Sequence, residues 1–138
     1  MDILRRNTDY GLRLLTHLAA NGQDEMLSTR VLAKQEGVSY QLASKLMQKL
    51  QRGGLVKSAM GPKGGFTLNR PAEKITLLEV ITTIQGAVHV NRCLLGDYKC
   101  PLLSKCTMRG KLADLQNQMD KFLGKTTLSE LVNEVRSL

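Results

Sequence analysis

Residues 39–68 read SYQLASKLMQKLQRGGLVKSAMGPKGGFTL, and this stretch decides the fold. Apolar side chains recur at helical spacing from Leu42 to Leu50, which predicts an amphipathic helix with Ser39 as its N-terminal cap. A Gly-Gly pair ends that helix, and two short strand candidates, residues 55–59 and 66–68, then flank a basic, glycine-rich turn. A helix followed by such a hairpin is typical of a winged helix.

Two more helices are expected before this stretch. Leucines at helical spacing predict a first helix from Thr8 to Ala20, closed by an Asn-Gly pair. Ser28 is a suitable cap for a second helix that runs to about Glu36, with Val31 and Leu32 turned inward. Two helices joined by a short glycine-containing connection are typical of a helix-turn-helix.

Helices continue after the hairpin. Thr76 to Glu79 is a capping box that opens a helix to about Gln85, and Thr127 to Glu130 is a second box before a terminal helix. Residues 90–107 show no periodicity and are expected to form a loop. A long helix then begins at Met108, and its apolar stripe consists of Met108, Leu112, Leu115, Met119 and Phe122. The predicted fold is mainly α with a small β-hairpin wing.

We expect one integrated domain with two functional regions. Residues 1–75 form the winged helix-turn-helix, and residues 76–138 hold the cysteine loop and the remaining helices. The formal net charge of +8 is uneven, because residues 1–70 carry 11 Lys and Arg against 5 Asp and Glu, and residues 71–138 carry 9 against 7. A basic half beside a near-neutral half favours a polyanion-binding module joined to a second element.

The polar face of the helix that follows Ser39 is the candidate DNA-reading surface. Gln side chains pair bidentately with adenine, Lys reaches guanine or a phosphate, and cations on the wing are drawn to phosphates or to a narrow minor groove. Arg5 and Arg6 are further candidates for phosphate contacts. The predicted DNA-binding residues are Ser39, Tyr40, Gln41, Ser44, Lys45, Gln48, Lys57 and Lys63. The alternative is that they form only the solvated face of an amphipathic helix.

Three cysteines, Cys93, Cys100 and Cys106, lie within fourteen residues. Structural zinc sites usually pair ligands about two to four residues apart, so this spacing fits zinc poorly. Iron–sulfur clusters are held by thiolates, and a loop with a glycine and a Cys-Pro step can wrap around one. The cysteines therefore predict an iron–sulfur cluster. The alternatives are inert packing cysteines and thiols that sense oxidants without a metal.

Three cysteines leave one coordination position for another ligand, and Asp9, Asp97 and His89 are the candidates. A non-thiolate ligand makes a cluster more labile, which suits a sensor. No pattern indicates an enzyme, because His17 and His89 stand far apart and the glycines at 61–65 lie in a hairpin. No apolar run approaches the roughly 18 residues of a membrane span, and the N-terminus lacks a secretory signal, so a cytoplasmic location is expected.

Four stretches together resemble the Rrf2 family of bacterial regulators, which includes the iron–sulfur regulators IscR, NsrR and RirA. They are residues 8–13, residues 61–66, the three-cysteine loop and residues 127–132, and the likeness spans nearly the whole chain. The resemblance implies a homodimer in which the long helix after the cysteine loop packs against its partner. It also implies a transcription repressor on a pseudo-palindromic double-stranded DNA operator, with an affinity that changes with cluster state.

The resemblance also bears on the fourth ligand. General cluster-biogenesis regulators of this family use a histidine three residues past the last cysteine, where this chain has Arg109. The nitric-oxide sensors use an aspartate of the first helix, supplied across the dimer, and Asp9 matches it; a carboxylate is also favoured there by the helix dipole. The resemblance thus implies a 4Fe-4S rather than a 2Fe-2S cluster that senses nitric oxide. The alternatives are sensing of iron or cluster status, and a cluster-free thiol redox regulator.

Overall fold

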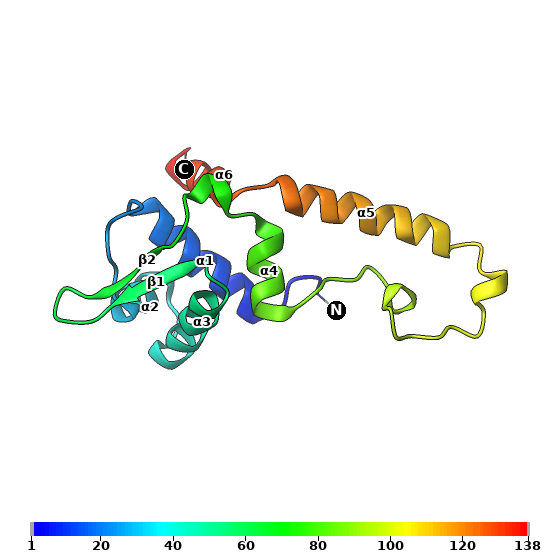
Figure 1. Ribbon diagram of the computed structural model, residues 1–138, viewed down its shortest axis with the longest axis horizontal. Helices are drawn as coiled ribbons and strands as arrows, with labels where there is room; N and C mark the ends of the chain where they lie inside the picture. The colour runs from blue at the N-terminus through cyan, green and yellow to red at the C-terminus, as the bar shows by residue number, and fades with distance from the viewer. Residues whose placement is uncertain (1, 138) are drawn as a thin grey trace.

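The computed structural model describes residues 2–137, with the side chains of the last helix described up to residue 134. Figure 1 shows a helical body, a hairpin at one end and a long helix that leads away from the body. The elements are α1 (Arg6–Ala20), α2 (Thr29–Glu36), α3 (Tyr40–Arg52), β1 (Val56–Ala59), β2 (Gly65–Leu68), α4 (Leu77–Gln85), α5 (Arg109–Lys125) and α6 (Leu128–Ser137). The predicted mainly α fold with a small wing is confirmed.

Side-chain caps begin three helices where the sequence predicts them. The Ser28 and Ser39 hydroxyls each accept a hydrogen bond of 3.2 Å from the amide three residues on, at the starts of α2 and α3. At α4, Thr76 Oγ1 accepts from the Glu79 amide at 3.2 Å, and Glu79 Oε2 accepts from the Thr76 amide at 3.1 Å. These bonds satisfy amides that a helix start leaves without partners.

The second predicted capping box has a different bond pattern. Glu130 Oε2 accepts from the Thr127 amide at 3.4 Å, but the Thr127 hydroxyl pairs with the Ser129 hydroxyl at 2.7 Å. The first helix also begins at Arg6, two residues before the predicted start. Both differences lie at helix ends, where the boundary can shift by one or two residues and a polar side chain has more than one nearby hydrogen-bond partner.

The core lies where α1 packs against α2, α3, α4 and α6. Its largest fully buried side chains are Leu14, Leu15, Leu18, Leu32, Leu46, Met47, Leu50, Leu55, Ile75, Ile81, Leu128 and Val56. The inward orientation predicted for Leu32 is confirmed, whereas that for Val31 is wrong, because Val31 is 39% exposed. The buried side of α2 is formed by Leu32 and Ala33, and Val31 points about 100° away from Leu32, outside that side.

The wing is a two-stranded antiparallel hairpin attached to the body through a third segment. Val56 pairs with Leu68 in its register. Phe66 also exchanges two backbone hydrogen bonds with Leu27, one of 3.1 Å and one of 2.8 Å. Gly65, at φ +155°, lies so close to the Leu27 carbonyl that a Cβ there would overlap it. The glycine therefore allows the wing to pack beside the start of α2.

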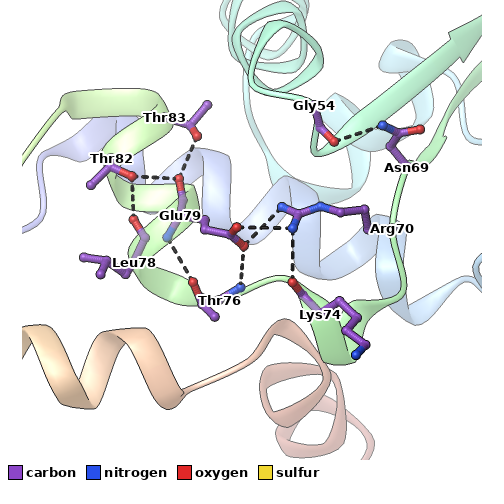
Figure 2. Close-up of polar contacts among 9 residues, drawn as sticks. All are labelled: Gly54, Asn69, Arg70, Lys74, Thr76, Leu78, Glu79, Thr82 and Thr83. Carbon is purple, nitrogen blue, oxygen red and sulfur yellow. Dashed lines mark hydrogen bonds and ion pairs between the residues drawn. The ribbon is translucent and has the colours of Figure 1, made fainter.

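Figure 2 shows the junction between the wing and α4. Arg70, just after β2, donates to the Lys74 carbonyl at 3.3 Å and to Glu79 Oε1 at 3.2 Å. Glu79 in turn caps Thr76 through the bonds described above. One carboxylate thus joins the end of the wing to the start of α4.

The chain from residue 86 to residue 125 leaves the helical body and returns along α5 (Figure 1). The loop predicted at 90–107 contains only two short 3₁₀ turns, Arg92–Leu94 and Leu103–Lys105. None of the residues of α5 is buried, and Leu115 and Phe122 are 50% and 67% exposed. Across residues 2–137, no helix combines the length and the apolar character needed to cross a membrane.

Candidate nucleic-acid interface and cysteine segment

The outward face of α3 carries the side chains predicted to read DNA. Gln41, Lys45 and Gln48 are exposed, and their spacing places them on one face of the helix. Tyr40 is 49% exposed, whereas Ser44 is half-buried. The hydroxyl of the sixth candidate, the exposed Ser39, already accepts the Leu42 amide as the cap of α3.

The wing carries the two remaining candidates. Lys57 lies on β1 and Lys63 lies in the turn between the strands, and both are exposed. The Gln51 side chain of α3 donates to the Ser58 hydroxyl of β1 at 3.0 Å. This bond joins the end of α3 to the first strand of the wing, beside Lys57.

Sequence reasoning missed Arg30, an exposed cation at the start of α2. Its guanidinium lies 4.9 Å from the centroid of the Tyr40 ring at the start of α3. Such cation–π contacts orient both partners. The sequence could have indicated that Arg30 is exposed, because it lies in the first turn of a helix, two residues past the Ser28 cap. Its contact with Tyr40 depends on the angle between α2 and α3.

The three cysteines lie outside the core and are all free. Cys93, in the first 3₁₀ turn, and Cys100 are half-buried, and Cys106, just after the second turn, is exposed. The Arg92 guanidinium stacks 4.7 Å from the centroid of the Tyr98 ring, which closes the loop around Cys93. The turn that contains Cys93 also packs against α5, so short-range contacts and this helix together hold the first part of the segment.

Gln116 of α5 attaches the chain that leads into this segment. Its amide nitrogen donates to the Val88 carbonyl, and its amide oxygen accepts from the Val90 amide, both at 2.8 Å. Asp120 Oδ1 accepts from the same Gln116 nitrogen at 3.0 Å. The Gln116 amide thus pairs with one backbone carbonyl and one backbone amide of residues 88–90, as a neighbouring β-strand would.

The predicted ligands are not brought together within the part of the chain described. Among residues 2–137, no three His, Cys, Asp or Glu side chains lie close enough to hold one metal ion. Asp9 is exposed on α1, and Asp97 and His89, which are near the cysteines in sequence, are also exposed. The cysteines themselves suit an iron–sulfur cluster, because their thiols are free and none of them is buried in the core.

Comparison with known proteins identifies the family of this winged-helix chain. The Rrf2 family, described as iron-dependent transcriptional regulators, matches residues 4–134. Protein aau3 of Rhizobium meliloti is 33% identical over 130 residues, which cover 94% of this chain and 84% of that protein. The transcriptional regulator IscR of Yersinia pseudotuberculosis is 31% identical over 124 residues, covering 90% of this chain and 75% of IscR.

The fold is also found in solved structures. CymR of B. subtilis, described as its global cysteine regulator, superposes with a TM-score of 0.80 at 23% identity, covering 97% of this chain and 98% of CymR. Helix α3, the wing and the cysteine segment described above all lie inside the matched range. The chain belongs to the Rrf2 family of transcriptional regulators, which are not enzymes.

Proposed function

We propose that this protein is a homodimeric, cytoplasmic transcription repressor whose affinity for a double-stranded operator is set by an iron–sulfur cluster that responds to nitric oxide. The observation that carries the proposal is the presence, in one Rrf2 chain, of an exposed basic reading surface and a separate segment with three free thiols. DNA binding is the property of the family, and the cluster, its signal and the dimer are proposed for this chain.

The exposure and the polar chemistry of the predicted residues support their proposed role in DNA binding. Gln41 and Gln48 present donors and acceptors of the kind that read base edges. Lys45, Lys57 and Lys63 offer cations to phosphates, and Lys45 can also reach guanine. Ser39 contributes by capping α3. Tyr40 and Ser44 lie beside the glutamines on the same helix, and Arg30 adds a cation to this surface through its contact with the Tyr40 ring.

The apolar stripe of α5 supports the dimer. Met108, at the helix cap, is 63% exposed, Leu115 is 50% exposed and Phe122 is 67% exposed, so these three members of the stripe do not cover the core of their own chain. Leu112 and Met119 are half-buried. Exposed apolar residues at helical spacing are typical of a helix that packs against another copy. A two-fold dimer would present two reading helices to an operator with pseudo-two-fold symmetry.

Cys93, Cys100 and Cys106 would hold the cluster, with Asp9 of the partner as the fourth ligand. Arg92, Lys99 and Lys105 would offset the negative charge of the thiolates. When bound, the cluster would supply iron that can react with nitric oxide, and three thiolates with one carboxylate would complete its four protein ligands. The 4Fe-4S form is proposed from the resemblance to the nitric-oxide sensors. Asp9 is exposed near the start of α1, where a partner can reach it.

The test is anaerobic purification followed by a visible spectrum and assays of iron and sulfide per chain. Equal iron and sulfide, close to four of each if the cluster is 4Fe-4S, and loss of operator binding on addition of nitric oxide are expected. The Asp9→Ala variant should lose the cluster faster than the matched control Asp24→Ala, which removes another exposed carboxylate. A colourless protein that cannot be reconstituted with iron and sulfide would overturn the cluster proposal.

Two further outcomes would redirect the proposal. Release of DNA on iron chelation but not on addition of nitric oxide would favour a sensor of iron or cluster status. The second alternative is a cluster-free thiol regulator, which the exposed, free thiol of Cys106 favours. A metal-free protein whose DNA affinity changes with thiol oxidation, and recovers on reduction, would establish that reading.

A further inference from the structure

Lys49 differs from the other charged residues of the reading helix. It lies one turn beyond Lys45 and is half-buried, and its ammonium donates to the Ile84 carbonyl of α4 at 3.2 Å. The last carbonyls of a helix have no partner within that helix, and the C-terminal end of the helix dipole favours a cation. The Lys49 ammonium therefore binds the end of α4, whereas the ammonium of a DNA-contacting lysine would face the DNA.

A second contact fixes the same two helices. A Cβ on Gly53, which ends α3, would lie 2.5 Å from Thr83 Cγ2 of α4. The end of α3 is therefore held against the last turn of α4 both by this close approach and by the ammonium of Lys49. The angle at which α3 enters a DNA groove then depends on the position of that last turn.

The end of α4 is also connected to both proposed ligand regions. Gln85 Oε1 accepts from the Thr8 hydroxyl at 2.6 Å and from the Arg5 amide at 2.9 Å, next to Asp9. In the other direction, the chain turns at Gly86 and reaches the Val88 and Val90 contacts with Gln116. Cys93 follows three residues later.

Resting on the proposed function, we infer that Lys49 is a positioning residue: it couples the pose of α3 to the segment of residues 84–93 that leads into the cysteines. The side chain acts through the Ile84 carbonyl and makes no DNA contact. A shift of Cys93 or of the start of α1 moves the end of α4, and Lys49 transfers that movement to the reading helix. By linkage, DNA binding must change the same segment in return.

The experiment compares Lys49→Met with the matched control Lys45→Met, which removes an exposed cation one turn earlier. The probe is a duplex that the full-length wild-type protein enriches from a random-sequence pool. Affinity is measured across a range of salt concentrations, and hydrogen exchange of residues 86–93 is measured with and without saturating duplex. Thermal unfolding confirms that each variant is folded.

The expected result separates a positioning role from a phosphate contact. Lys49→Met should bind at least about fivefold more weakly with the wild-type salt slope, whereas Lys45→Met should reduce that slope by about one. DNA should slow exchange at residues 86–93 in the wild type and in Lys45→Met, but not in Lys49→Met. Lys49→Arg keeps a cationic donor and should restore both properties.

Several results would overturn the inference. A reduced salt slope in Lys49→Met would make Lys49 a phosphate contact, and unchanged protection of residues 86–93 in that variant would remove the coupling role. A wild type that binds the duplex without any change at residues 86–93 would overturn this inference and leave the proposed function standing. A wild type that enriches no duplex would overturn the proposed function itself, and this inference with it.

Discussion

Arg70 and Glu79 form a two-pronged ion pair across the junction between the wing and α4. Arg70 Nη2 lies 3.1 Å from Glu79 Oε2, and Arg70 Nη1 donates to Glu79 Oε1 at 3.2 Å. The two side chains are 38% and 42% exposed, so solvent screens their attraction. The same carboxylate also caps α4 at Thr76, and we expect this second role to matter more for stability (Figure 2).

Replacement of Glu79 should therefore destabilise the fold more than replacement of its partner. Glu79→Ala removes a helix cap and an ion pair, and should lower the free energy of unfolding by about 1–2 kcal/mol. Arg70→Ala should lower it by less than about 1 kcal/mol. Urea denaturation measures both, with the exposed Glu73→Ala as control. Equal losses in the two variants would mean that the ion pair dominates.

Gly65→Ala should destabilise the protein through the attachment of the wing. The new methyl group would overlap the Leu27 carbonyl at a backbone φ of +155°, so both packing and conformation oppose it. We expect a loss of about 1–3 kcal/mol in the free energy of unfolding. The control is Gly96→Ala, since a Cβ at Gly96 meets no atom within 4 Å. Equal stability of the two variants would argue against this packing.

The three cysteine variants should lose iron without losing the fold. Cys93→Ser, Cys100→Ser and Cys106→Ser each remove a soft thiolate donor, so iron per chain and visible absorbance should fall sharply. None of the three thiols belongs to the core, so the urea midpoint of the metal-free protein should stay unchanged. Ser104→Ala serves as an exposed control in the same loop. Full iron retention by any cysteine variant would exclude that residue as a ligand.

Salt dependence should distinguish a phosphate contact, as proposed for Lys63 of the wing, from a base contact, as proposed for Gln48 of α3. Lys63→Met should weaken binding to all duplexes by a similar factor and reduce the salt slope by about one, as expected for a lost phosphate contact. Gln48→Ala should keep the slope and change base preference by about 1–3 kcal/mol at one position. Fluorescence anisotropy at several salt concentrations measures both. A Gln48→Ala variant with unchanged base preference would remove Gln48 from the reading set.

A charge in the stripe of α5 should break the dimer. Phe122→Glu places a carboxylate on a side chain that is 67% exposed in the single chain and would be desolvated in a dimer. Sedimentation should show a monomer for this variant and a dimer for Asn117→Glu, an exposed polar position on the same helix. Dimers in both variants would place the subunit interface elsewhere.

Much of the fold was predictable because its signals are local. A cap such as Ser28, Ser39 or Thr76 bonds an amide three residues away, so the sequence alone reveals it. The glycine-rich turn and the flanking strand candidates likewise predict the wing. The prediction for Val31 failed because apolar character does not say which of two adjacent residues meets the neighbouring helix.

The sequence by itself determined the order of helices and wing, the basic half and the three clustered thiols, since each depends on neighbours along the chain. Only the tertiary structure decided that Lys49 turns to Ile84, that Arg30 stacks on Tyr40 and that Gln116 holds the approach to Cys93. Those contacts join residues that are ten to thirty-five positions apart. They depend on how whole helices pack, and packing is set by the sum of many buried contacts rather than by any local pattern.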